Sequence, residues 1–135
     1  MLSVGMVFNQ SCRIPDPVEK DFIGEWQSED GARFSFENNG IFYTENLPGE
    51  KMFDGFKEYE KKKLNESGSW NITKSQGNWI MQLVFNSKQL NNSFLTQFYI
   101  ADKNGIASNK PPWYLYKYIG DPDEGIMYGL YKVKP

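Results

Sequence analysis

Few side chains in this sequence could carry out chemistry, and their types narrow what the protein can do. Its 135 residues include no histidine and a single cysteine, Cys12. Without histidine, Ser-His-Asp and Cys-His nucleophiles and histidine-ligated zinc or haem are excluded. One cysteine excludes an internal disulfide and a cysteine-rich metal site. Carboxylate, tyrosine and lysine chemistry remains, so we expect a protein that is not an enzyme and that uses no cofactor or metal.

The densest group of carboxylates is the segment Asp121-Pro122-Asp123-Glu124. Clustered oxygen ligands suit a hard cation. Turn chemistry is the simpler interpretation, because Asp side chains cap backbone N–H groups, Pro presets φ, and the flanking Gly120 and Gly125 accept unusual dihedral angles. A glycosidase-like enzyme would instead need two acids that converge in a cleft. We expect a turn here, with no metal.

The other group with functional potential is aromatic, since 16% of the residues are Phe, Tyr or Trp. Six of them could line a cavity, with apolar walls and a few O–H and N–H groups that orient a ligand. These candidate ligand-binding residues are Tyr43, Trp70, Trp79, Tyr99, Tyr114 and Tyr116. In the alternative, such side chains fill the interior and leave no cavity, and some tyrosines lie outside. Both alternatives are open from the sequence.

The elements that must position these residues follow a period of two, with Gly, Asn, Asp and Pro at the boundaries. Alternation predicts eight strands, over residues 24–28, 32–37, 41–45, 67–73, 79–85, 94–101, 113–119 and 126–133. Hairpin-length turns join nearly all of them, and Asn39-Gly40 is the strongest hairpin signal. We predict an all-β fold, an eight-stranded antiparallel up-and-down barrel, because closing the meander removes exposed edges.

One segment breaks the strand pattern. Near residues 50–64, Met52, Phe53, Phe56, Tyr59 and Leu64 recur at helical spacing. This predicts a short amphipathic helix inserted between strands. It would either cover part of the sheet or act as a lid over an opening, and we favour the first.

The N-terminal residues differ in character from the rest. Residues 1–18 are interpreted as a signal-like remnant followed by a proline-containing linker, and residues 19–135 as the barrel. Ser11-Cys12 resembles the end of a bacterial lipoprotein signal, which makes Cys12 a candidate lipidation site and the bacterial cell envelope the expected location. The alternative is a disordered N-terminus with an incidental cysteine. A helical turn is expected over residues 16–22, with Asp16 as its N-cap.

Charge and hydropathy limit the partners. The net charge is -2, so no basic surplus is present to neutralise phosphates and a nucleic-acid partner is not expected. No apolar run approaches the length of a membrane span, so a membrane would be reached only through a lipid anchor on Cys12. The sequence does not indicate an oligomeric state.

The segment Phe22-Ile23-Gly24-Glu25-Trp26 resembles the start of the lipocalin and fatty-acid-binding (calycin) group, in which a helical turn precedes Phe-x-Gly-x-Trp on the first strand. The resemblance implies that Gly24 and Trp26 are structural, and that Trp26 closes one end of the barrel beneath a basic residue of the last strand. Lys132 is the candidate for that residue. Any ligand would then enter at the opposite end.

The ordered motifs are also similar to those of small bacterial envelope proteins of uncharacterised function that carry a lipocalin-like domain. They are Gly24-Glu25-Trp26, Asn39-Gly40-Ile41-Phe42, Gly68-Ser69-Trp70 and the segment 118–125. The first functional hypothesis is therefore an exported lipocalin-like barrel that encloses a small apolar or aromatic ligand. The alternative is a solid barrel that acts as a protein-interaction or inhibitor module at the envelope, through exposed Tyr and Trp side chains.

Overall fold

The structure is a computed structural model that describes residues 16–52, 63–88, 91–102 and 113–134. Its elements are η1 (Glu19–Asp21), β1 (Gly24–Gln27), β2 (Arg33–Phe36), β3 (Ile41–Glu45), β4 (Leu47–Pro48), α2 (Gly49–Met52), β5 (Lys63–Leu64), β6 (Ser67–Ser75), β7 (Asn78–Ser87), β8 (Asn92–Asp102), β9 (Trp113–Tyr118), η3 (Pro122–Glu124) and β10 (Met127–Lys134).

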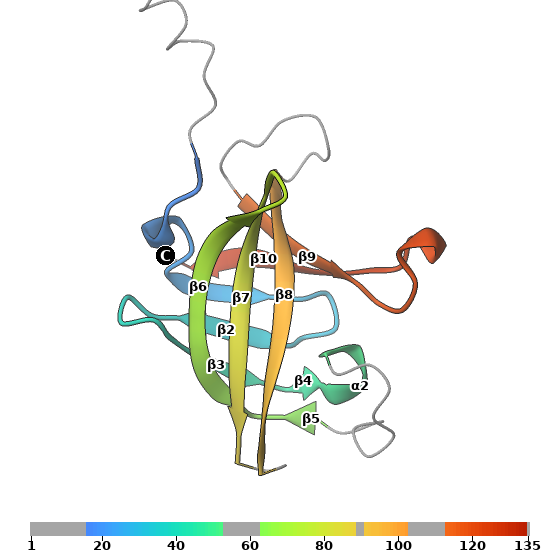
Figure 1. The fold of residues 1–135 in the computed structure, drawn as a ribbon. Coiled ribbons are helices and arrows are strands. Elements are labelled where there is room, and N and C mark those ends of the chain that lie inside the picture. The colour runs from blue at the N-terminus through green and yellow to red at the C-terminus, as the bar shows by residue number, and fades with distance from the viewer. Residues whose placement is uncertain (1–15, 53–62, 89–90, 103–112, 135) are drawn as a thin grey trace, which may run out of the picture.

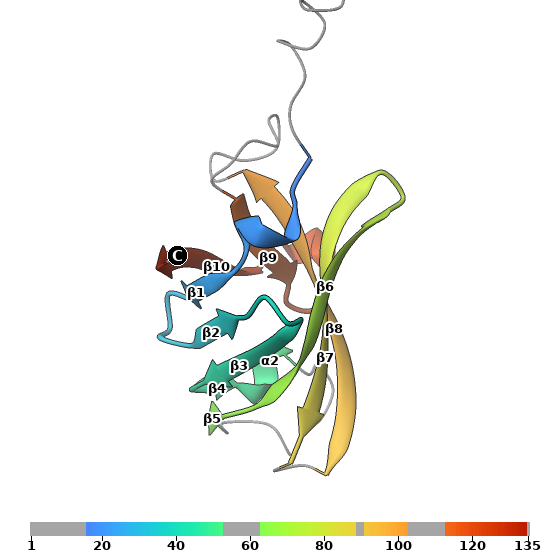
Figure 2. The same cartoon turned by 90° about the vertical axis from the view of Figure 1, so that its left-hand side faces the viewer.

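Eight of these strands close into one antiparallel barrel, in the order β1-β10-β9-β8-β7-β6-β3-β2. Neighbours in the barrel are neighbours along the chain once the β4–β5 pair is set aside, so the topology is up-and-down. This confirms the predicted fold class. β6, β7 and β8 are long and run across the shorter strands β1–β3, and the β6–β7 hairpin projects at one end (Figures 1 and 2).

Local sequence explains the turns. In the β2–β3 turn, Gly40 has φ 81° and the Asn39 side chain accepts a hydrogen bond from the Ile41 N–H at 3.1 Å. In the β6–β7 turn, Gln76 and Gly77 have φ 50° and 83°. Two consecutive positive φ values match the right-handed twist of the flanking strands, which keeps the hairpin tight.

The segment between β3 and β6 contains the short helix α2, which overlaps the start of the range 50–64 that the sequence predicts to be helical. β4 and β5 pair beside it as a separate two-stranded sheet. Residues 53–62, the middle of the predicted helix, lie outside the described residues, and its last two residues, 63–64, form strand β5 and not helix. Whether this segment covers the sheet or acts as a lid stays a prediction.

The N-terminal turn begins later than predicted. η1 starts at Glu19 and its N-cap is Val18, not Asp16. The Val18 N–H donates to the Asp21 carboxylate at 3.0 Å, so the stabilising acid lies at the end of the turn and not before it. Cys12 lies outside the described residues.

Aromatic side chains fill much of the barrel interior. Phe22, Trp26, Phe34, Phe42 and Phe98 have no exposed surface. Their rings contact one another at centroid distances of 5.8 Å for Phe22–Trp26 and 6.1 Å for Phe34–Phe98. Burying such large side chains supplies much of the hydrophobic stabilisation of a domain this small.

Trp26 lies at the end of the barrel where η1 packs. Its indole N–H donates to the Phe22 carbonyl at 2.9 Å, and Lys132 is its register partner on β10. The Lys132 ammonium donates to the Asp21 carbonyl at 3.0 Å, and the Trp113 indole donates to the Asp21 carboxylate at 3.2 Å. These hydrogen bonds hold η1 against this end of the barrel.

No helix among the described residues is long and apolar enough to cross a membrane.

Candidate functional site

Five tyrosines form one continuous patch on the outside of the barrel, over β8, β9 and β10. We call this patch the tyrosine face; its members are Tyr99, Tyr114, Tyr116, Tyr118 and Tyr131. Alternation along β9 places Tyr114, Tyr116 and Tyr118 outward, because Trp113 and Leu115 point into the core. Strand register then sets Tyr99 opposite Tyr116, and Tyr131 opposite Tyr114.

The rings of the tyrosine face pack mainly against one another. Tyr99 and Tyr116 stack at 5.4 Å between ring centroids, and Tyr114 and Tyr131 stack at 4.9 Å. Tyr118 meets Tyr116 edge to face at 5.9 Å. Because cross-strand neighbours cover each other's ring faces, the patch is held rigid by its own contacts. What it offers to solvent is therefore rich in ring edges and hydroxyl groups.

Gly129 makes room for this packing. It lies opposite Tyr116 on β10, and a Cβ built there would overlap the Tyr114 ring. The ring therefore lies across the glycine backbone. Partial burial raises the pKa of Tyr114 to about 12, with further contributions from Tyr131, Glu29 and Tyr116. Burial also raises the pKa of Tyr116. Both phenols are thus neutral hydrogen-bonding groups at physiological pH.

A cleft of about 390 Å³ adjoins the tyrosine face and shares Tyr114 and Tyr131 with it, and Gly129 also lines it. We call it the acid-edged cleft, because Glu29 and Asp30 of the β1–β2 turn line it. Its remaining walls combine apolar and polar side chains. They include Ile119, Ile126, Met127, Tyr128 and Lys51.

Asp30 is the best-connected carboxylate of this cleft. It accepts hydrogen bonds from Lys51 at 3.0 Å, from the Tyr128 hydroxyl at 3.2 Å and from the Ser28 hydroxyl. Burial alone would raise the pKa of Asp30, but the Ser28 and Lys51 interactions outweigh it and lower the pKa below the ordinary value. The Lys51 ammonium also lies 5.6 Å from the centre of the Tyr128 ring. The cleft therefore already holds one cation between a carboxylate and an aromatic ring.

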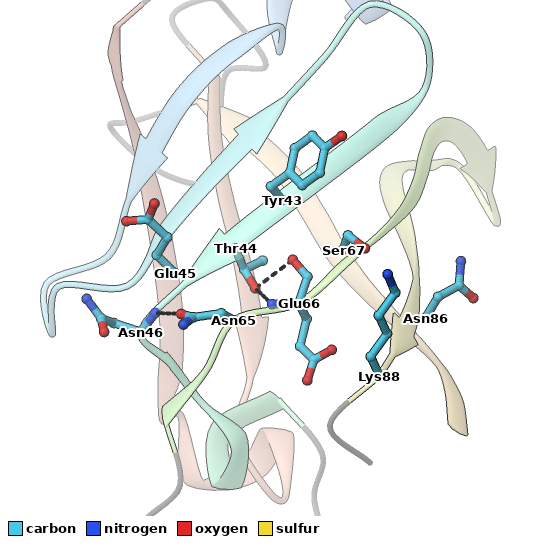
Figure 3. A pocket seen from close by; sticks show the side chains of 9 residues that line it. All are labelled: Tyr43, Thr44, Glu45, Asn46, Asn65, Glu66, Ser67, Asn86 and Lys88. Atoms are coloured by element: carbon cyan, nitrogen blue, oxygen red, sulfur yellow. Dashed lines mark hydrogen bonds between the residues drawn. The ribbon is translucent and has the colours of Figure 1, made fainter. Parts of the chain in front are cut away.

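A second hollow, of about 610 Å³, lies where β3 and β6 part, on a different wall of the barrel (Figure 3). Polar side chains line it, among them Asn46, Asn65, Asn86 and Lys88, and Tyr43 stands at its edge. Beneath it, the Glu66 carbonyl accepts hydrogen bonds from the Thr44 N–H at 2.8 Å and from the Thr44 hydroxyl at 3.3 Å. The hollow is polar and open, unlike a site for an apolar ligand.

The structure distributes the six predicted ligand-binding residues over four places. Tyr99, Tyr114 and Tyr116 come together in the tyrosine face. Trp70 is buried in the core, and its indole donates to the Glu37 carbonyl at 3.0 Å. The remaining two lie apart, Trp79 under the ammonium of Lys74 at 5.8 Å and Tyr43 at the polar hollow.

Sequence reasoning did not select Tyr118 and Tyr131 as site residues. Alternation with Tyr114 and Tyr116 was a sufficient signal for Tyr118. For Tyr131 no local signal existed, because its place beside Tyr114 follows from the β9–β10 register.

The sequence also did not indicate a polar group inside the barrel. Glu66 is 5% exposed and accepts a hydrogen bond from the Ser87 hydroxyl at 2.8 Å. Lys117 shares the core-facing side of β9 with Leu115, and its ammonium donates to the Thr96 hydroxyl at 3.0 Å and to the Met52 carbonyl at 3.2 Å. Both residues place an ionisable side chain in an interior that is otherwise largely apolar.

The acidic segment at 121–124 forms η3. The Asp121 side chain accepts from the Asp123 N–H at 3.0 Å, and Gly125 ends the turn with φ 71°. This is the turn chemistry that the sequence predicted. Within the described part of the chain, no three acidic or cysteine side chains gather closely enough to hold a metal ion.

Comparisons with protein-family models, with curated proteins and with solved structures found no match. The closed eight-stranded antiparallel barrel is consistent with a calycin-like fold.

Proposed function

We propose that this protein is a binding module that docks a protein partner on its tyrosine face. One observation carries the proposal: five tyrosines adjoin on the outside of the barrel while large side chains fill much of its inside. Tyr99 and Tyr131 are 40% and 37% exposed, whereas the aromatic residues Phe34, Phe42 and Phe98 inside are fully buried. This combination favours the interaction module over the enclosed ligand.

The type of side chain supports a protein partner. Tyrosine is enriched at protein interfaces because it supplies large, rigid contact area with one polar tip. Stacking fixes the rings before binding, so little side-chain entropy remains to be lost. A sugar chain would need several open ring faces side by side, and here stacking covers one face of each ring in the Tyr99–Tyr116 and Tyr114–Tyr131 pairs.

The proposed location is the bacterial cell envelope, with Cys12 as the lipid anchor and the linker before η1 as a tether. This part of the proposal rests on the sequence around Cys12. Intact mass spectrometry of protein purified from its host membranes tests it. An added acyl mass that disappears in Cys12→Ser supports the anchor, and an unmodified chain overturns it.

Site-specific photocrosslinking in the host tests the partner. Gln97 is exposed and faces outward on β8, two residues from Tyr99, whereas Ser69 is exposed on β6 and pairs with Ile41 on a different wall. A benzophenone amino acid at position 97 should give a discrete crosslinked protein, and one at position 69 should not. The Tyr99→Ala/Tyr116→Ala variant should lose the crosslink, and Tyr43→Ala should keep it.

Three results would contradict the proposal. They are crosslinking that is equal at positions 97 and 69, a crosslink only to polysaccharide, and a crosslink that survives loss of both tyrosines. Circular dichroism and thermal melting of the double variant establish that it remains folded. A crosslink to a second copy of the chain would show that the tyrosine face binds another copy of this protein and not a different partner.

A further inference from the structure

We infer that the acid-edged cleft receives an arginine side chain of the partner, so that the tyrosine face binds a basic segment. This inference rests on the proposed function, because the cleft continues the same surface. Tyr114 and Tyr131 belong to both, and Gly129 is the floor beneath Tyr114. A chain lying along the face could therefore place a side chain in the cleft without leaving the surface.

The negative charge of the two turns that border the cleft favours a positively charged side chain. The β1–β2 turn contributes Glu29 and Asp30, and the turn between Ile119 and Ile126 contributes Asp121, Asp123 and Glu124. Neither turn contains Lys or Arg. Like charges across an interface cost binding energy, so an acidic partner is disfavoured and a basic one is attracted.

The cleft already shows that it accommodates a cation. Lys51 lies between the Asp30 carboxylate and the Tyr128 ring, at 3.0 Å and 5.6 Å. Asp30 is thus already paired with a cation of the same chain, Lys51. Glu29 is exposed on the same turn, and its charge is near enough to contribute to the raised pKa of Tyr114. Glu29 is the carboxylate available at the cleft mouth for a cation from outside.

Arginine fits this arrangement better than lysine does. A guanidinium is planar, so it can stack on a phenol ring while its N–H groups bond a carboxylate in a fork. The cleft offers both, with Glu29 as the carboxylate and, as the ring surface, the face of Tyr131 turned away from Tyr114. Its volume of about 390 Å³ is large enough to take one such side chain. Ile126 and Met127, each 51% exposed, would cover the aliphatic stem.

The test titrates the full chain with a short capped peptide that alternates arginine and glycine, and follows backbone amides by NMR. The amides of Gly129 and Tyr131 should shift in a saturable way. The same peptide with citrulline, which is isosteric but uncharged, should not bind, and the lysine version should bind more weakly.

Two cleft variants should change the affinity in opposite directions. Glu29→Gln should weaken arginine-peptide binding about threefold, the size expected for one exposed ion pair. Lys51→Gln should tighten it, because Asp30 then becomes available to the peptide. Glu37→Gln is the matched control, since Glu37 is an exposed acid at the opposite end of β2 from Glu29. It should leave the affinity unchanged.

The inference is overturned if the citrulline peptide binds equally, if Glu29→Gln and Glu37→Gln have the same effect, or if the shifts appear instead around Tyr43. Its failure differs from failure of the proposed function. A crosslinked partner that depends on Tyr99 and Tyr116, with no arginine binding in the cleft, removes only the inference. Arginine binding in the cleft, with no partner on the tyrosine face, removes the proposed function and leaves only an arginine-binding cleft without a docked partner.

Discussion

The ring of Tyr114 lies across the backbone of Gly129, in the space where any other residue would place its Cβ. Glycine is usually unfavourable inside a strand, because it adds backbone entropy to the unfolded chain and packs nothing. Here an aromatic ring from the neighbouring strand covers it. The relationship fixes Tyr114 against Tyr131 and sets one wall of the acid-edged cleft.

Gly129→Ala should displace the Tyr114 ring while the barrel persists. The added methyl group overlaps the ring and hydroxyl of Tyr114, a side chain that can rotate away, so the loss in free energy of unfolding should stay within about 1 kcal/mol. Released from partial burial, Tyr114 should titrate closer to pH 10 than to 12. Ultraviolet titration of tyrosinate checks this, and an unchanged titration curve would contradict it.

Gly68→Ala should be far more damaging than Gly129→Ala. At Gly68 the methyl group would overlap the Val84 backbone carbonyl and lie 2.9 Å from the Phe42 ring. Backbone cannot rotate aside, so β6 and β7 must separate, and we expect a loss of about 3 kcal/mol. Urea unfolding of the two variants side by side measures the contrast. Equal losses would show that the close approach at Gly68 is wrong.

Alkaline pH should destabilise the protein through Tyr114. Its pKa is raised in the folded state, so between pH 10 and about 12 Tyr114 loses its proton in the unfolded chain but keeps it in the folded one. Unfolding therefore becomes more favourable as the pH rises, and the stability present below pH 10 is lost over this range. The Tyr114→Phe variant lacks the ionisable hydroxyl group. Its free energy of unfolding should therefore fall less steeply than that of the wild type over this range, and parallel curves would contradict the raised pKa.

Ser87→Ala should destabilise the barrel from inside. The Ser87 hydroxyl donates to the buried carboxylate of Glu66, and hydrogen bonds to charged groups contribute about 2 kcal/mol. Ser69→Ala, at an exposed position on β6, is the control and should change stability by less than about 0.5 kcal/mol. Chemical denaturation measures both. A loss for Ser87→Ala no larger than for Ser69→Ala would show that Glu66 is adequately solvated without it.

The sequence by itself determined the eight strands, the order in which they follow one another and most turns, because these depend on local periodicity and on Gly and Asn at defined positions. Alternation alone also places Tyr114, Tyr116 and Tyr118 on one side of β9. It did not predict the start of η1, where a hydrogen bond from Val18 to Asp21 replaces the expected Asp16 cap.

Only the tertiary structure decided which side of each aromatic strand points inward. On β9 both sides carry aromatic or apolar residues, so the choice depends on the partners that strand register supplies. Leu115 pairs with Leu130 and Ile100 inside, whereas Tyr116 pairs with Tyr99 and Gly129 outside. The tyrosine face and its cleft therefore arise from pairings between β8, β9 and β10, which no local pattern encodes.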